Sequence, residues 1–227
     1  MNKISILIPV YNEKNSLIEL LKKVENVSFG LTKEIILIDD NSTDGTKELY
    51  SSLNQYKILY HDKNMGKGAA LRDGIKAATG DIIIIQDADL EYNPEDYKPL
   101  VDLIKDNKAD VVYGSRLSNK KNNKNFLIMS FIANQVLSAF TRLLYNTTIT
   151  DMETCYKAFR AEVIKPLNIE SNRFDFEPEI TAKILKQNIR FKELPISYNA
   201  RSVEEGKKIN WKDGLQAIFT LLKYKFK

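Results

Sequence analysis

The chain has 227 residues, of which 43% are hydrophobic and 28% are charged, and these values are typical of a soluble globular domain. Its 34 lysines and arginines against 30 acidic residues give a formal net charge of +4, too small for a histone-like nucleic-acid binder. We therefore expect no nucleic-acid partner. A single cysteine, Cys155, excludes an intrachain disulfide and cysteine-rich zinc sites, and a single histidine, His61, excludes sites that need two imidazoles.

The N-terminal residues are followed directly by an apolar segment and lack the features of a signal peptide. No stretch reaches the roughly 20 consecutive apolar residues that span a bilayer. The nearest candidate, residues 126–145, is interrupted by Asn134, Gln135 and Arg142. We therefore expect a cytoplasmic protein that is either soluble or peripheral on the cytoplasmic face of a membrane.

Short apolar runs alternate with helical patterns in the first half of the chain. The apolar runs predict strands at residues 4–10, 34–38, 57–60, 82–85 and 109–113. The segments between them predict helices at residues 15–24, 47–53 and up to about 78, and a fourth that begins at Pro94. This alternation predicts an α/β fold with a mostly parallel central sheet and helices on both faces.

The second half begins with a polar loop at residues 117–125 and continues with fewer strands. A helix at residues 177–186 and strands at residues 156–160 and 190–198 are expected there. Two amphipathic helices, residues 126–145 and 211–227, suit a membrane surface or pack on the core, and the pattern leaves both alternatives open. Without internal repeats or a linker rich in Pro, Gly or Ser, residues 1–227 are expected to form one domain.

Paired acids follow two of the predicted strands. Asp87 and Asp89 come directly after four consecutive isoleucines, and Asp39 and Asp40 end the second strand. Ligands of open α/β sheets bind beyond the carboxyl ends of the strands, so we expect these acids to converge in one cleft. Two carboxylates at this spacing can hold a divalent cation on a diphosphate, and Glu91 offers a third oxygen.

Other residues are expected at the same edge of the sheet as the paired acids. Residues 11–13 (Tyr-Asn-Glu) either begin a helix or contact a nucleobase, and Asp39-Asp40 either caps a turn or binds a base or ribose. Residues 64–68 form a glycine loop in which Lys67 adds positive charge, but the loop lacks the complete P-loop pattern. Arg116 follows the fifth strand and places a permanent charge at this edge.

Taken together, these motifs resemble glycosyltransferase family 2, and more narrowly its dolichyl-phosphate mannosyltransferase-like (polyprenyl-phosphate glycosyltransferase) branch. The matching segments are IPVYNE (8–13), IDDNSTDGT (38–46), NMGKGAALRDG (64–74), QDADLEYNPEDY (86–97), VYGSR (112–116), TDMETCYKAFR (150–160), FEPEITAKI (176–184) and the WKDG that begins at Trp211. The resemblance implies a GT-A fold in which residues 1–116 bind the nucleotide sugar and residues 117–227 bind the acceptor.

The resemblance also implies a role for individual residues. The nucleotide sugar would be bound by Pro9, Tyr11, Glu13, Asp40, Lys67, Asp87, Arg201 and Lys207. The metal, Mg²⁺ or Mn²⁺, would be bound by Asp87, Asp89 and Glu91. The catalytic residues would be Asp89, Asp151 and Arg116, and the acceptor would be bound by Arg116, Lys124 and Thr154.

The expected reaction is an inverting, metal-dependent transfer of sugar from a nucleotide diphosphate sugar to a polyprenyl (dolichyl-type) phosphate. An acceptor phosphate is already anionic near neutral pH, so the site needs no histidine base. The alternative is transfer to a saccharide or glycan hydroxyl in cell-surface polysaccharide synthesis, with Asp151 as the base. A module that binds nucleotide sugar without catalysis is the competing hypothesis from another class.

Overall fold

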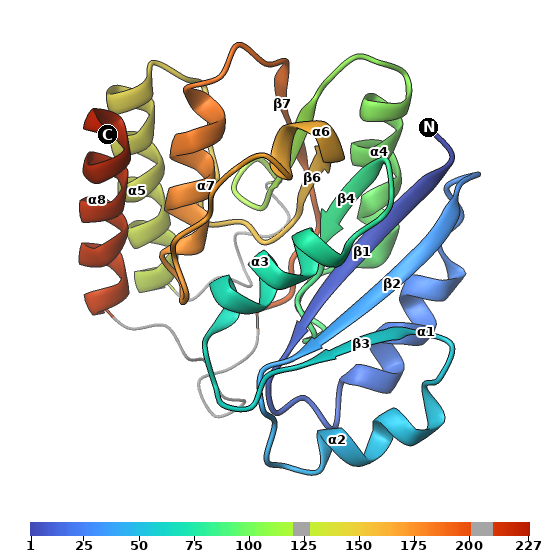
Figure 1. The fold of residues 1–227 in the computed structure, drawn as a ribbon. Helices are drawn as coiled ribbons and strands as arrows, with labels where there is room; N and C mark the ends of the chain where they lie inside the picture. Colours follow the sequence, from blue (N-terminus) through green and yellow to red (C-terminus); the bar gives the residue numbers. More distant parts are fainter. Residues whose placement is uncertain (120–127, 201–210) are drawn as a thin grey trace.

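The computed structural model describes residues 1–119, 128–200 and 211–227. Its centre is a seven-stranded sheet with the strand order β3-β2-β1-β4-β6-β5-β7 (Figure 1). The strands are β1 (Lys3–Val10), β2 (Thr32–Asp39), β3 (Lys57–Tyr60), β4 (Ile82–Ile85), β5 (Val111–Ser115), β6 (Lys157–Arg160) and β7 (Phe191–Pro195). Two strands, β3 and β4, have the predicted bounds, and the mostly parallel α/β sheet is confirmed.

One strand runs against the others. β6 pairs antiparallel with both β4 and β5, whereas the remaining neighbouring pairs are parallel. Since β4 and β5 are each antiparallel to the strand between them, they run in the same direction. The carboxyl ends of β1, β2, β4 and β5 therefore lie along one edge of the sheet.

Helices cover both faces of the sheet, as predicted. They are α1 (Leu17–Asn26), α2 (Thr46–Leu49), α3 (Lys67–Ala77), α4 (Tyr97–Lys105), α5 (Ile128–Tyr145), α6 (Ala161–Ile164), α7 (Phe176–Leu185) and α8 (Trp211–Phe226), with 3-10 turns η1 (Tyr50–Ser52) and η2 (Pro94–Asp96). In Figure 1, α3 crosses in front of the sheet, α1 and α4 lie behind it, and α5, α7 and α8 stand together at one end.

The apolar strands form the core. All four residues of β4 are buried, as are Ile4, Ile6, Leu7 and Ile8 of the neighbouring β1. A strand that is apolar on both faces requires helices above and below it, which explains why these runs show no alternation in the sequence. Burial of this apolar surface is the main stabilising contribution to the fold.

Two element boundaries differ from the sequence prediction. The helix expected at residues 47–53 divides into α2 and η1, where the hydroxyls of Ser51 and Ser52 donate to the carbonyls of Glu48 and Leu49. Such side-chain bonds compete with the regular helix. The strand expected at residues 190–198 ends at Pro195, after which Ser197 donates to Asp96 instead of continuing the ladder.

Within the described parts of the chain, no helix combines the length and the apolar character needed to cross a bilayer. The helix expected at residues 126–145 is described from Ile128 onward. Most of the polar loop predicted at residues 117–125 lies outside the described residues.

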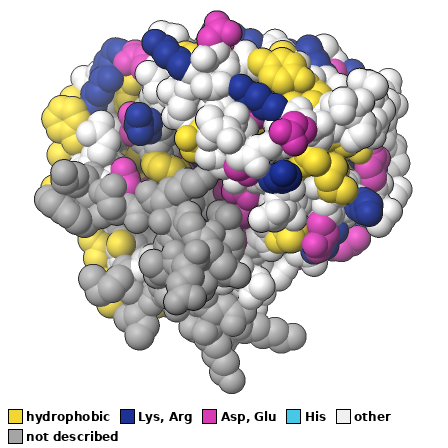
Figure 2. All heavy atoms as spheres, turned by 90° about the horizontal axis from the view of Figure 1, so that it is seen from below, with side chains coloured by type: hydrophobic (Ala, Val, Ile, Leu, Met, Phe, Trp, Pro, Cys, Tyr) yellow, Lys and Arg dark blue, Asp and Glu magenta, His cyan; other side chains and the backbone are white. Residues whose placement is uncertain are grey.

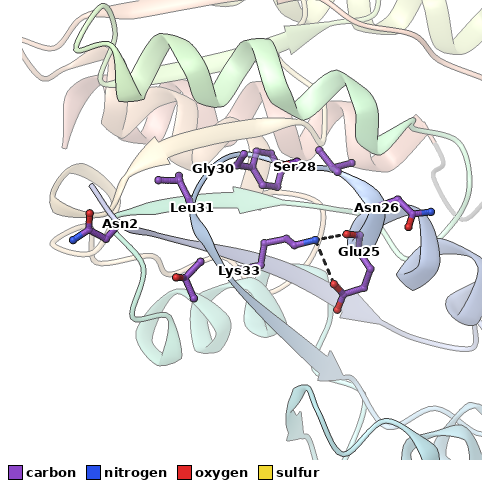
Figure 3. Close-up of a pocket in the computed structure, with 10 residues that line it drawn as sticks. Asn2, Glu25, Asn26, Ser28, Gly30, Leu31 and Lys33 are labelled. Atoms are coloured by element: carbon purple, nitrogen blue, oxygen red, sulfur yellow. Dashed lines mark hydrogen bonds and ion pairs between the residues drawn. The ribbon is translucent and has the colours of Figure 1, made fainter.

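A pocket of about 510 Å³ lies at the opposite edge of the sheet from the paired acids (Figure 3). Its lining includes Asn2, Gly30 and Lys33, at the amino ends of β1 and β2, and Lys33 forms an ion pair with Glu25 at 3.3 Å. The predicted site is at the carboxyl ends of the strands, so this pocket is separate from it.

Candidate active site

The loop that carries Asp87 and Asp89 is anchored at its first residue. The backbone N–H of Gln86 donates to the Leu7 carbonyl of β1 at 2.9 Å, and its side-chain oxygen accepts hydrogen bonds from the hydroxyls of Tyr97 and Tyr156. Asp89 is 7% exposed and accepts a hydrogen bond from the Glu91 N–H at 3.1 Å. The acids therefore lie on a fixed turn directly beyond β4.

Asp40 organises the glycine loop. Its carboxylate accepts the backbone N–H groups of Met65 and Gly66, both at 2.7 Å, and contacts His61 Nδ1 at 2.7 Å. The second ring nitrogen of His61 lies 3.3 Å from Asp73. The structure thus gives Asp40 and His61 a scaffolding role, and the predicted contact of Asp40 with a nucleoside stays a prediction.

Gly66 occupies a conformation that favours glycine, with φ of 99° and ψ of 160°. A Cβ at this position would lie 2.3 Å from the Asn172 carbonyl oxygen. We expect Gly66→Ala to lower the free energy of unfolding by about 2–4 kcal/mol, measured by urea denaturation. Gly214→Ala in α8 is the control, because nothing lies within 4 Å of its Cβ, and it should stabilise by about 0.5–1 kcal/mol. Equal midpoints for the two variants would contradict this account.

The loops after β1 and β2 are joined by hydrogen bonds. Asn12, at φ of 58°, accepts the Thr43 N–H at 2.7 Å, and the Glu13 N–H donates to the Thr46 hydroxyl at 3.1 Å. Tyr11, Glu13 and Pro9 are partly exposed at this edge. They are therefore placed where a nucleoside beyond the strand ends could reach them, and their binding role stays a prediction.

Lys67 is the first residue of α3 and lies between two acids. Its Nζ is 2.7 Å from Asp87 Oδ1 and 3.2 Å from Glu177 Oε1 in α7. Burial alone raises the pKa of the Asp87 carboxyl, but the charge and hydrogen bond of Lys67 outweigh it and hold that pKa below its ordinary value. Because Lys67 follows the loop bound by Asp40, a chain of contacts connects the acids after β2 with those after β4.

The donor set fits a hard divalent cation that is shared with a ligand. Mg²⁺ is commonly bound through one or two carboxylates plus substrate phosphates, and Asp87 and Asp89 offer such oxygens. In the described residues, no three His, Cys, Asp or Glu side chains gather into a complete metal site. The predicted third ligand, Glu91, instead accepts the Tyr198 hydroxyl at 3.0 Å. Metal binding at Asp87 and Asp89 stays a prediction.

Arg116 and Asp151 form a buried, two-pronged ion pair. Arg116 Nε and Nη2 donate to the two carboxylate oxygens of Asp151, both at 2.8 Å, and its backbone N–H donates to the same group. Asn134 adds a hydrogen bond at 2.7 Å. Asp151 is fully buried, and although burial raises its carboxyl pKa, Arg116 lowers that pKa below the ordinary value. This geometry favours a positioning role over the role of base that a hydroxyl acceptor would require of Asp151.

Two aromatic rings lie against the Arg116 guanidinium. Its guanidinium carbon lies 5.9 Å from the ring centre of Tyr92 and 5.1 Å from that of Tyr198. Tyr92 follows the Asp89 turn, so these contacts place the Arg116 guanidinium beside the paired acids. Figure 2 views the molecule from below, the side toward which β1 and β4 run in Figure 1, and shows acidic and basic side chains interspersed there.

A polar cluster lies beneath this edge. Lys157 in β6 is fully buried and donates to the carbonyls of Met152 and Thr154. The Thr154 hydroxyl is buried and makes no hydrogen bond within the described residues, and the same holds for Glu153 Oε1. Thr154 is buried, and its predicted contact with an acceptor stays a prediction.

Glu153 should make stability depend on pH. Burial and the neighbouring Glu177 and Asp151 raise the pKa of its carboxyl from 4.5 to about 7, against the opposing effect of Lys157 and Arg116. A raised acid pKa means that the folded state binds the proton more tightly, so stability falls as pH rises from about 4.5 to about 7. The loss amounts to as much as about 3 kcal/mol.

Glu153→Gln cannot ionise and should not show this loss. We expect urea denaturation at pH 5 and pH 8 to differ less for this variant than for the unmodified protein, by up to about 3 kcal/mol. Glu162→Gln is the control, because that carboxyl is 78% exposed. The same pH dependence in all three proteins would contradict the assignment.

Several predicted residues lie outside the described parts of the chain. These are Arg201 and Lys207, predicted for the donor or acceptor phosphates, and Lys124, predicted for the acceptor. The sequence analysis missed Glu177, Asn134 and Tyr198 as members of the site. Glu177 lies inside the FEPEITAKI segment, but only tertiary structure brings this helical acid to Lys67.

Comparisons with known proteins identify the family of the chain. A family model described as glycosyl transferase family 2 matches residues 5–167. Dolichol-phosphate mannosyltransferase of Pyrococcus furiosus is 30% identical over 210 residues, which are 90% of this chain and 59% of that protein. UDP-N-acetylglucosamine–dolichyl-phosphate N-acetylglucosaminyltransferase of Methanococcus voltae is 26% identical over 245 residues, covering 98% of this chain and 96% of that protein.

Solved structures show the same fold. Glucosyl-3-phosphoglycerate synthase of Mycobacterium tuberculosis, crystallised with Mn²⁺, UDP and phosphoglyceric acid, has a TM-score of 0.72 at 20% identity, over 99% of this chain and 78% of that chain. The same enzyme has also been crystallised with Mg²⁺ and UDP, with a TM-score of 0.71. This likeness confirms the predicted GT-A fold.

Proposed function

This chain belongs to glycosyl transferase family 2, and on that premise we propose that it moves a sugar from a nucleotide diphosphate sugar to a polyprenyl phosphate, with inversion. Two relatives whose names contain a dolichyl or dolichol phosphate support this acceptor class. The proposal concerns the activity of a chain that spans 59% of the length of the Pyrococcus furiosus relative.

The observation that carries the proposal is the engagement of Asp151 by Arg116. A hydroxyl acceptor needs a base to remove its proton, whereas a phosphate acceptor is already ionised. Asp151 is fully buried, and both of its oxygens accept from Arg116. His61 is similarly held between Asp40 and Asp73. A site in which Asp151 and His61 are engaged in this way suits an acceptor that arrives as an anion.

In the proposed reaction, an oxygen of the acceptor phosphate bonds to the anomeric carbon while the bond from that carbon to the donor diphosphate breaks. The nucleoside diphosphate leaves with the electron pair. Arg116, oriented by Asp151, stabilises the negative charge that grows on the phosphates. Lys67 lies beside the same edge and adds a second positive charge.

Asp87 and Asp89 would hold the divalent cation, Mg²⁺ or Mn²⁺, that relatives in this fold have in their crystals. When bound, such a cation neutralises charge on the donor diphosphate. The carboxylates contribute hard oxygen ligands on a rigid turn, and Gln86 keeps that turn in register with β1.

A hydroxyl acceptor is the second candidate, and one observation favours it. The pKa of the Glu153 carboxyl is about 7, which is well suited to a general base. Glu153→Gln separates the two functions, because transfer to a phosphate should persist in this variant whereas transfer to a hydroxyl should be lost.

The decisive assay incubates the purified protein with a panel of UDP- and GDP-sugars, Mn²⁺ and one of three acceptors. These acceptors are a polyprenyl phosphate, phosphoglyceric acid and an oligosaccharide, and products are identified by mass. The proposal expects a glycosylated polyprenyl phosphate. A product formed only on the oligosaccharide or on phosphoglyceric acid would overturn it.

Exposed apolar residues on α5 and α8 support a peripheral position on the cytoplasmic face of a membrane. In α8, Leu215, Phe219, Leu222 and Phe226 follow helical spacing and are 37–82% exposed, and Leu143 of α5 is 83% exposed. Yellow side chains at the left margin of Figure 2 lie on the side where Figure 1 places α5 and α8. The opposite stripe of α8, which includes Leu221 and Tyr224, is buried, so one face of this helix packs on the core and the other leaves apolar side chains exposed.

Flotation with anionic liposomes tests this position. We expect the protein to float with the vesicles, and the double variant Phe219→Glu/Phe226→Glu to remain in the dense fraction, because it removes apolar contact and adds negative charge. Both side chains are exposed, so the melting temperature should be unchanged. Equal flotation of the two proteins would argue against a membrane role for α8.

A further inference from the structure

The Lys67 ammonium is shared by two acids from different parts of the fold. Asp87 belongs to the turn after β4 and Glu177 to the first turn of α7, and they lie 2.7 Å and 3.2 Å from Lys67 Nζ. The backbone around Lys67 is fixed, because the Gly66 N–H donates to Asp40 and the Ala69 N–H donates to the Asn172 carbonyl. Movement of the ammonium is therefore limited to rotation of the Lys67 side chain.

One carboxylate oxygen of Glu177 accepts no hydrogen bond from the described residues. Its side chain is 8% exposed, and Oε2 is buried without a hydrogen-bond partner among the described residues. A buried carboxylate oxygen without a partner is unfavourable and uncommon in folded proteins. Since Oε1 already contacts Lys67, a modest rotation of the lysine would give both oxygens a donor.

Asp87 is both the partner of Lys67 and the proposed ligand of the cation. In the function proposed above, its carboxylate binds a divalent cation, and a lysine ammonium 2.7 Å from the same oxygen repels that cation. Lys67 must then leave Asp87. Without a second anion nearby, it would turn toward solvent and away from the donor diphosphate.

We propose that Glu177 is a positioning residue, which retains the Lys67 ammonium at the site when Asp87 binds a divalent cation. Lys67 thus pairs with Asp87 before a cation binds there and contacts the donor diphosphate once it has bound. This inference rests on the proposed function, because it requires a cation on Asp87. It gives a role to Glu177, which neither the sequence motifs nor the proposed acceptor chemistry had placed at the cation site.

Mn²⁺ binding to four proteins tests the proposal: the unmodified chain, Lys67→Met, Glu177→Gln and the double variant. Free Mn²⁺ is counted by electron paramagnetic resonance, with and without UDP. Lys67→Met should bind Mn²⁺ about 10-fold more tightly, because the competing charge is gone. Glu177→Gln should bind it roughly 3- to 10-fold more weakly, because Lys67 then has Asp87 as its remaining anion.

The double variant separates positioning from a simple loss of charge. If Glu177 acts through Lys67, Glu177→Gln should change Mn²⁺ affinity by less than about twofold in the Lys67→Met background. The same factor in both backgrounds would overturn the proposal, as would a failure of both the unmodified chain and Lys67→Met to bind Mn²⁺. Glu177→Asp, which keeps the charge, should restore most of the affinity and guards against a folding defect in Glu177→Gln.

This titration contains neither sugar nor lipid. If the product assay yields no glycosylated lipid but the Mn²⁺ titration shows coupling between Lys67 and Glu177, only the proposed acceptor is rejected. If the product assay yields glycosylated lipid but the titration shows no coupling, only the role of Glu177 is rejected.

Discussion

Asp89→Asn should lower kcat/KM for sugar transfer by about 10³-fold or more. The change keeps the shape of the side chain but removes one of the two carboxylates that would hold the cation on the donor diphosphate. Charge stabilisation at the leaving group is usually the largest contribution to such catalysis. Release of nucleoside diphosphate measures the rate, and Mn²⁺ binding measured in parallel should weaken in the same variant.

Asp106→Asn is the matched control for this substitution. Asp106 is an exposed aspartate at the end of α4, paired with Lys108 at 2.8 Å and remote from the strand ends. Its replacement should leave the rate within about twofold, as expected for a surface substitution. If Asp89→Asn retained activity comparable to this control, the metal assignment at Asp89 would be wrong.

Asp151→Asn is expected to lower the free energy of unfolding by about 3–5 kcal/mol. The substitution leaves the buried guanidinium of Arg116 without its counter-ion, and removal of one partner of a buried pair is far more costly than loss of a surface pair. Arg116 is 9% exposed and Asp151 is fully buried, so water does not replace the lost contact. Urea denaturation monitored by tyrosine fluorescence measures the effect.

Lys98→Met provides the comparison. Lys98 pairs with Asp102 on the outer face of α4, where the two side chains are 58% and 34% exposed. Its removal should change stability by no more than about 0.5 kcal/mol. A urea midpoint for Asp151→Asn that matches that of Lys98→Met would show that the pair is not a structural element of the site. Activity should also fall in Asp151→Asn, because Arg116 loses its orientation.

The sequence was most informative where local pattern determines structure. Four isoleucines predicted β4 with its observed bounds, because a buried parallel strand needs apolar residues on both faces. The acids at its end were correctly placed beyond the sheet edge. Element order alone did not reveal that β6 inserts antiparallel between β4 and β5, since pairing between distant segments leaves no local pattern.

The site was predicted in part for the same reason. Asp87, Lys67 and Arg116 were singled out because they lie in motifs next to strand ends. Their partners were not, because Glu177 and Asn134 are helical residues that tertiary structure brings to Lys67 and Asp151. The sequence also could not show that Arg116 and Asn134 already engage the Asp151 carboxylate, which favours a positioning role for this residue.

Diffraction from crystals grown with Mn²⁺ and UDP, recorded at the manganese absorption edge, tests the central claim most directly. The account predicts one anomalous peak in contact with Asp87 and Asp89 and with the diphosphate of UDP, and Lys67 displaced toward Glu177. A manganese peak that touches neither carboxylate, or UDP bound away from the carboxyl ends of β1 and β4, would contradict it.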